Sequence, residues 1–145
     1  MIGKNNPLNI RCGRKYWKGQ TGVTKGFCDF ESIDFCIRAW LYLCFVSYQR
    51  YLLTPMTISQ FIHRYCPVGD GANDPDYYVK FVCNRIFVID GYRFSLQPDR
   101  IVNLLSKKEI FALCSQMCLM ESSYNLFYFK FCSVYEKLTF VEDRP

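Results

Sequence analysis

The chain has 145 residues, of which half are hydrophobic and 18% are aromatic, and its formal net charge is +5. This length fits one domain, and the apolar content excludes a disordered chain and allows a core without metal or disulfide staples. The longest uninterrupted apolar run, 39–46, is far shorter than the roughly 20 residues of a membrane-spanning helix, so no transmembrane span is expected.

Nine cysteines and one histidine form no pattern of metal ligands, because no Cys-x-x-Cys pair is present. The odd cysteine count, and an N-terminus without the apolar stretch of a secretory signal, argue against a disulfide framework. Most of the cysteines lie within apolar runs and are interpreted as small core residues. We therefore expect no metal and no cofactor, and a chain that is made in the cytoplasm.

Residues 1–31 are predicted to be an irregular, glycine-rich and basic segment in which short strands are allowed. Six basic and no acidic residues occur among its first 25 positions. Nucleic acid, peptidoglycan and anionic lipid can all accept such a surface, and solvated charge is the plainer interpretation.

Residues 32–138 are predicted to be a helical core. The segment 32–51 is apolar almost all round, which is typical of a helix at the centre of a domain. A second helix is predicted over 57–65, with Thr57 and Gln60 at the spacing of a capping box. His63 falls on its polar side and is expected to be solvated.

Residues 67–74 are predicted to be a loop, and Asp74 and Pro75 to begin a helix that runs to about residue 85. Residues 86–96 are predicted to form a short hairpin that turns at Asp90 and Gly91, with an extension of the preceding helix as the alternative. A short helix over 98–105 is predicted to follow.

Ser106 and Glu109 form a second capping box and begin a helix predicted over 106–121. We place Ser115 and Gln116 on or near its polar side. A last aromatic helix over 125–138 precedes a polar tail, 139–145. The predicted class is thus mainly α, in a single domain covering residues 1–145, with one short β-hairpin.

Glu121 is the one ionisable residue whose predicted position is unusual. It follows Met117 by four residues and Cys118 by three, so it continues the apolar stripe of its helix. Desolvation of a carboxyl group raises its pKa, and a carboxyl group that is still protonated near neutral pH can act as the general acid of glycoside hydrolysis. The alternative is a carboxylate at a helix end that is turned to water.

Short motifs in one order along the chain carry a family resemblance. The first are Asn5-Asn6-Pro7-Leu8-Asn9-Ile10-Arg11, Trp17-Lys18-Gly19-Gln20 and Gly26-Phe27-Cys28-Asp29-Phe30. The later ones are Ile37-Arg38-Ala39, Thr57-Ile58, Arg64-Tyr65-Cys66-Pro67, Asn73-Asp74 with Tyr78-Val79, and Met120-Glu121-Ser122. Together they resemble small phage and prophage proteins of the structural protein P5-like family. The chain departs from that pattern at Cys66, where alanine is usual, and at Ser123, where glycine is common.

That family is distantly similar, in permuted order, to lysozyme-type muramidases and glucosaminidases. The resemblance implies a single compact lysozyme-like helical domain with a groove for the glycan strand of peptidoglycan. It implies Glu121 as the general acid and Asn9, Arg11 and Trp17 as substrate-binding residues, with Trp17 stacking on a sugar ring. A core anchor is the alternative role for Trp17.

A second catalytic carboxylate is not assigned, and Asp29 and Glu31 are the nearest candidates. The first functional hypothesis is a phage- or prophage-type peptidoglycan hydrolase, present in the host cytoplasm or in the virion and reaching the wall through a lysis pore or as part of the particle. The second is a non-catalytic virion or mobile-element structural protein that contacts other virion proteins. The third, a nucleic-acid-binding module that uses the basic N-terminus, is the least favoured.

Overall fold

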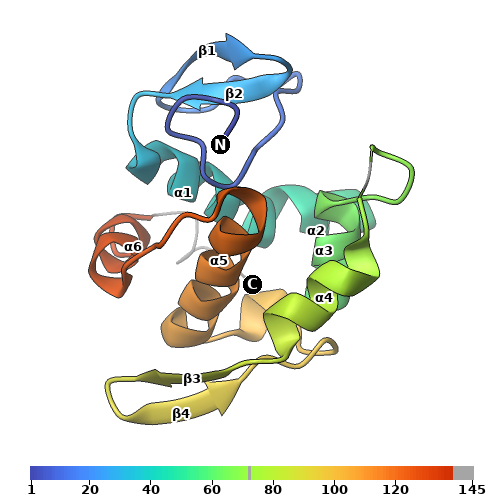
Figure 1. Ribbon diagram of the computed structural model, residues 1–145, viewed down its shortest axis with the longest axis vertical. Helices are drawn as coiled ribbons and strands as arrows, with labels where there is room; N and C mark the ends of the chain where they lie inside the picture. Colours follow the sequence, from blue (N-terminus) through green and yellow to red (C-terminus); the bar gives the residue numbers. More distant parts are fainter. Residues whose placement is uncertain (72, 139–145) are drawn as a thin grey trace.

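The computed structural model describes residues 1–71 and 73–138, so the predicted tail lies outside the described residues. In chain order the elements are β1 (Gln20–Thr24), β2 (Phe27–Phe30), α1 (Ile33–Tyr42), the π-helix η1 (Leu43–Ser47), α2 (Tyr48–Leu52), α3 (Ile58–Tyr65), α4 (Pro75–Cys83), β3 (Ile86–Ile89), β4 (Tyr92–Ser95), the 3-10 turn η2 (Val102–Leu104), α5 (Lys107–Ser122) and α6 (Tyr128–Tyr135). Helices dominate, with one hairpin at each end of the molecule (Figure 1). The predicted mainly α class is confirmed, as is the hairpin predicted within 86–96.

The short strands that the sequence allowed within 1–31 are present in its last part, where β1 and β2 form an antiparallel hairpin, so the structure has two hairpins instead of the single one expected. Lys25 and Gly26 both have positive φ, 51° and 86°, as a tight hairpin turn requires. Arg11 forms an isolated antiparallel bridge with Phe27 and so adds the N-terminal segment to this hairpin.

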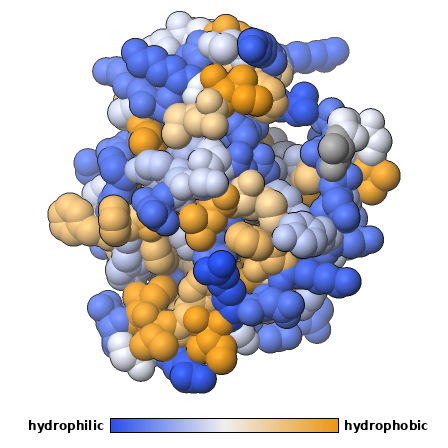
Figure 2. Space-filling view, in the orientation of Figure 1, coloured by the Kyte–Doolittle hydropathy of each residue, from blue (hydrophilic) through white to orange (hydrophobic). Residues whose placement is uncertain are grey.

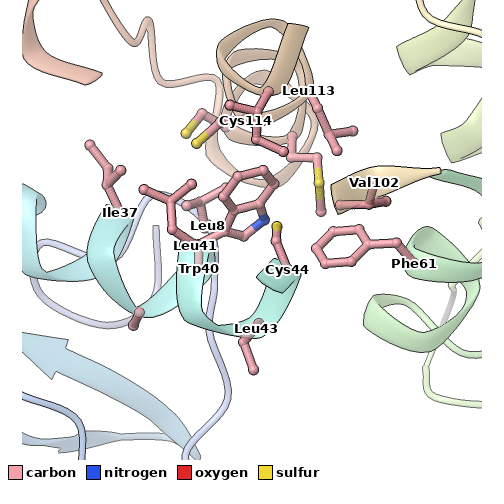
Figure 3. Close-up of a cluster of buried hydrophobic side chains, with 14 of the residues drawn as sticks. Leu8, Ile37, Trp40, Leu41, Leu43, Cys44, Phe61, Val102, Leu113 and Cys114 are labelled. Carbon is pink, nitrogen blue, oxygen red and sulfur yellow. The ribbon is translucent and has the colours of Figure 1, made fainter. Parts of the chain in front are cut away.

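The central helix of the domain is continuous from α1 through η1 to α2, because the backbone stays in the right-handed helical region at both junctions. Trp40 is fully buried at its middle and meets the Phe61 ring edge-on, with ring centroids 5.6 Å apart. Figure 3 shows the cluster around this indole, drawn from the N-terminal segment, α1, η1, α3, the segment at Val102 and α5. This confirms the central helix predicted from the apolar run.

The helix starts expected from capping patterns are present. The Thr57 hydroxyl accepts from the Gln60 N–H at 3.1 Å, and the Gln60 side chain accepts from the Thr57 N–H at 2.9 Å. At α5 the Ser106 hydroxyl and the Glu109 carboxylate make the same reciprocal pair. Asp74 caps α4 by accepting from the Tyr77 N–H at 3.1 Å.

The helix predicted over 98–105 is wrong except for the short turn η2. The main chain of this segment pairs with the start of α3 instead: the N–H groups of Ile58 and Ser59 donate to the carbonyls of Arg100 and Pro98. The Val102 N–H donates to Met56 in the same way. Main-chain groups used between segments are not available for intrahelical bonds, so a helix does not form.

Helix α5 runs through the middle of the domain and is buried on almost every side (Figure 1). Ser115 and Gln116, placed on the polar side by the sequence analysis, are buried; the Ser115 hydroxyl donates to the Ala112 carbonyl at 3.0 Å. The last helix is shorter than predicted, since α6 begins only at Tyr128 and ends at Tyr135. Within the described ranges, none of the helices has the length and apolar character needed to cross a bilayer.

Apolar side chains are exposed at the end of the molecule opposite β1 and β2. Ile86 and Val88 of β3 and Tyr92 of β4 are each at least half exposed. Figure 2 shows orange side chains gathered over this end.

Candidate active site

The asparagines of the N-terminal motif fix the path of the segment that forms one wall of the site. The Asn6 amide is fully buried and donates to the carbonyls of Ile10 and Cys28, both at 2.9 Å, while its oxygen accepts from the Ile10 N–H at 2.9 Å. Asn5 donates to the carbonyls of Phe30 and Glu31 at 3.0 and 3.1 Å. These side-chain hydrogen bonds fix the N-terminal segment, which has no regular secondary structure of its own at these positions.

The same segment is joined to the C-terminal end of α5. The Asn9 amide donates to the main-chain carbonyl of Glu121 at 2.9 Å and to its carboxyl oxygen Oε1 at 3.3 Å. The Ser122 hydroxyl donates to the Pro7 carbonyl at 2.7 Å, and the Tyr65 hydroxyl donates to the Leu8 carbonyl. Residues more than 100 positions apart therefore meet around Glu121.

A pocket of about 480 Å³ opens beside this junction. Its walls come from the N-terminal segment, β2, the central helix, the end of α3, the loop after it, and α5; the lining side chains are Asn9, Ile10, Arg11, Trp17, Phe27, Leu43, Tyr48, Arg64, Tyr65, Cys66, Pro67, Asp70, Asn73 and Glu121. The four residues nominated from the sequence, Asn9, Arg11, Trp17 and Glu121, thus line one pocket. The fold brings these residues together, because the C-terminal end of α5, which holds Glu121, lies beside the N-terminal segment (Figure 1).

The Glu121 carboxyl group is held largely away from water. Burial raises its pKa, while the neighbouring Tyr78 hydroxyl, the Asn9 amide and the Arg11 charge offset part of the increase; the net shift is upward. The buried Tyr78 hydroxyl is close enough to influence this carboxyl group, yet it meets the geometry of a hydrogen bond with no described residue. Tyr78 is therefore a polar neighbour of Glu121. The carboxyl group can retain a proton at a higher pH than an ordinary glutamic acid.

A second carboxylate shares the pocket, and it is neither of those nominated from the sequence. Asp70, in the loop after α3, pairs with the Arg11 guanidinium at 3.0 Å. Asp29 instead accepts from the Lys4 N–H at 2.7 Å and from the Thr24 hydroxyl at 2.8 Å, and it supports the hairpin. Glu31 is exposed, and neither it nor Asp29 lines the pocket. The sequence shows Asp70 in a predicted loop, and only the fold brings it into the pocket that Glu121 lines.

Trp17 is mainly a wall of the pocket. Its side chain is 7% exposed and packs edge-on against Tyr42, with ring centroids 5.6 Å apart. The Lys15 ammonium lies 5.0 Å from the Trp17 ring centroid. Little of the indole face is available to a sugar, so the geometry fits the core-anchor role better than stacking.

Glu121 also borders a second hollow of about 230 Å³. Its lining is Cys66, Asn73, Asp74, Tyr77, Tyr78, Met120 and Glu121. Cys66 and Asn73 are shared with the larger pocket, so the acid lies between two adjoining hollows. A chain-like ligand that crosses the site would place groups on both sides of this carboxyl group.

The other ionisable residues considered from the sequence lie elsewhere. His63 is exposed, as predicted, and its Nε2 atom lies 3.1 Å from the Asp76 carboxylate. All nine cysteines are free thiols, six of them buried. In the part of the chain that the structure describes, no cluster of three His, Cys, Asp or Glu side chains could hold a metal ion. Comparison with protein-family models and with curated proteins found no match to this chain.

The raised pKa of Glu121 predicts a pH-dependent stability difference. Because the folded-state pKa is above that of the unfolded chain, the wild type is expected to lose stability as pH rises from the ordinary glutamate pKa through the raised value. Glu121→Gln cannot ionise and should lack this loss, so its stability relative to the wild type should increase over the same window. Urea unfolding of both proteins across this pH range measures the difference. Curves that stay parallel at every pH would contradict a desolvated carboxyl group.

Proposed function

We propose that this protein is a phage- or prophage-type hydrolase of the peptidoglycan glycan strand, with a lysozyme-like site and Glu121 as its general acid. The observation that carries the proposal is a carboxyl group with a raised pKa, half-buried between two adjoining hollows. A glycosidase needs an acid of this kind to protonate the leaving oxygen, with sugar units bound on either side of the bond.

In this proposal, residues that line the pocket divide the steps of the reaction between them. Glu121 gives its proton to the glycosidic oxygen as the bond from the anomeric carbon to that oxygen breaks. The Asp70 carboxylate stabilises the positive charge that develops on the sugar. Water then adds to the anomeric carbon and passes its proton to the Glu121 carboxylate, which restores the acid. Asn9 orients Glu121 through its bonds to the carbonyl and carboxyl oxygens.

The lysozyme-like and P5-like resemblance is part of this proposal. It gains support from the contact between the Asn9 amide and Glu121, which lie 112 positions apart. A permuted lysozyme-like site requires that the motif at the start of the chain and the acid near its end meet in space. We place the protein in the host cytoplasm or the virion, from which it would act on the wall after release or delivery.

The second candidate is a virion structural protein without catalysis. Large exposed apolar side chains favour it: Phe127 and Phe129, before and within α6, are 74% and 87% exposed, so they are available to other virion proteins. The third candidate, nucleic-acid binding, has less support because the basic residues of the N-terminus are partly engaged. Arg11 pairs with Asp70, and the Lys15 ammonium lies 3.7 Å from the Tyr42 ring centroid.

A turbidity assay on purified bacterial cell walls tests the first candidate. The wild-type protein should clear the suspension and release new reducing ends in proportion. A folded protein that leaves the walls intact, while co-purifying with particles, would favour the structural role. Tight DNA binding that weakens steeply with salt would favour the third candidate.

A further inference from the structure

The hairpin of β3 and β4 has an apolar face that the described residues leave uncovered. Strand β3 consists of apolar residues only, which is typical of a strand covered on both sides. On one side, Phe87 lies opposite Phe94, and their rings stack with centroids 5.5 Å apart and pack against the core. Because side chains alternate between the faces of a strand, Ile86 and Val88 take the other side, where they are 61% and 62% exposed.

This end of the molecule also carries a surplus of positive charge. The segment 80–108, which contains the hairpin, has six basic residues and two acidic ones, Asp90 and Asp99. Two of the basic residues are paired with glutamates outside the segment, in the ion pairs Arg100–Glu109 and Lys107–Glu136. The other four form no ion pair within the described part of the chain; they are Lys80, Arg85, Arg93 and Lys108. Four unpaired cations against two acids leave this end positive.

Three of these cations lie next to the exposed apolar side chains. Arg93 is directly opposite Val88 in the hairpin register, so both belong to the uncovered face. Arg85 immediately precedes β3. The Lys108 ammonium lies 5.8 Å from the ring centroid of Tyr92, which is half exposed beside the hairpin turn. Apolar and cationic groups are therefore adjacent on one surface.

A hollow of about 370 Å³ continues this surface onto α4. Its lining is Tyr77, Lys80, Phe81, Asn84 and Arg85, so among the described residues it contains two cations and no acid. Asp76, one turn before Lys80 on α4, lies 3.1 Å from the Nε2 atom of His63 instead. A hollow with a lysine and an arginine suits a phosphate group, because both side chains donate charge-assisted hydrogen bonds to phosphate oxygens.

We propose that the β3–β4 end of the molecule docks on a phospholipid bilayer with anionic headgroups. Ile86 and Val88 enter the boundary of the acyl chains, Tyr92 lies at the level of the headgroups, and the cations contact lipid phosphates. Such a bilayer offers an apolar layer directly beneath a layer of negative charge, which matches the surface just described. A second copy of the chain would bring two positive surfaces together, so the charge favours lipid over self-association. The inference does not depend on cleavage of the cell wall.

Sedimentation with vesicles tests the inference. One set of vesicles contains phosphatidylcholine alone, and the other contains equal parts of phosphatidylcholine and phosphatidylglycerol. The wild type should bind the anionic vesicles at least about tenfold more tightly, since each cation near an anionic surface adds to binding, and added salt should weaken this binding. No binding to the anionic vesicles, or equal binding to both sets, would overturn the inference.

Substitutions on the uncovered face separate its apolar and charged contributions. The double variant Ile86→Thr with Val88→Thr keeps β-branched side chains that suit a strand. It should bind anionic vesicles about tenfold more weakly, because a hydroxyl resists leaving water. Arg93→Gln should bind the anionic vesicles about fivefold more weakly and leave binding to phosphatidylcholine unchanged.

Val23→Thr is the matched control, because Val23 is a strand valine, 52% exposed, in the hairpin at the opposite end of the molecule. It should bind vesicles as the wild type does, and thermal unfolding shows that each variant is folded. A double variant that binds as tightly as the wild type, or a Val23→Thr protein with the same loss, would contradict docking through β3 and β4. Analytical ultracentrifugation covers the other occupant: self-association that the double variant abolishes, without vesicle binding, would assign this face to a second copy and overturn the inference.

Discussion

Glu121→Gln is expected to slow the clearing of cell walls by at least about 100-fold, the lower end of what a general acid contributes. Glutamine matches the size of glutamic acid and can still accept from the Asn9 amide, but it has no proton to give to a leaving oxygen. The bond from Asn9 to the main-chain carbonyl at position 121 does not involve the substituted side chain, so the wall of the pocket should persist. The initial rate of turbidity loss gives the effect, and thermal unfolding shows that the variant is folded.

Glu31→Gln makes the same chemical change at an exposed carboxylate outside the pocket and should retain the wild-type rate. The rate of wall clearing by Asp70→Asn should lie between the rates of these two variants, because this substitution removes a stabilising charge and leaves the proton donor in place. A Glu121→Gln protein as active as the wild type would remove Glu121 from the mechanism and leave the virion structural role as the better account.

Asn6→Ala is expected to lower the free energy of unfolding by about 3 kcal/mol, since each buried main-chain group that loses its partner costs about 1–3 kcal/mol. The substitution removes the donors to the Ile10 and Cys28 carbonyls and the acceptor of the Ile10 N–H, all in a fully buried site. The Ile10 carbonyl keeps a bond from the Cys28 N–H, which limits the loss. Urea unfolding at a fixed pH measures the change.

Asn125→Ala is the matched control for Asn6→Ala. Asn125 is exposed, and its side chain makes no hydrogen bond to the described residues. Its substitution should change the free energy of unfolding by less than about 0.5 kcal/mol, as surface changes usually do. If Asn6→Ala lowered the free energy of unfolding as little as this control, the hydrogen bonds of the Asn6 side chain would not stabilise the N-terminal wall of the pocket.

Local chemistry predicted the helix starts and one hairpin correctly. The side chains of Thr57, Asp74 and Ser106 each accept a hydrogen bond from the main-chain N–H three residues ahead, so their effect is encoded within one turn of the chain. The hairpin at Asp90 and Gly91 is equally local, since both residues have the positive φ of a tight turn. The helix predicted over 98–105 was wrong, because main-chain hydrogen bonds between distant segments, such as that from the Ile58 N–H to the Arg100 carbonyl, form in place of intrahelical ones.

For the candidate site, the sequence by itself selected Glu121, because a carboxyl group that continues an apolar stripe is recognisable from helical spacing alone. The sequence could not indicate Asp70, instead of Asp29 or Glu31, as the second carboxylate of the pocket. Local sequence does not distinguish these three acidic residues, because what separates them is their position in the folded chain. In the tertiary structure Asp70 lines the same pocket as Glu121, while Asp29 accepts hydrogen bonds from Lys4 and Thr24 beside the β1–β2 hairpin. Spacing along the chain determines which face a side chain takes, and only packing between distant segments determines which other residues it meets.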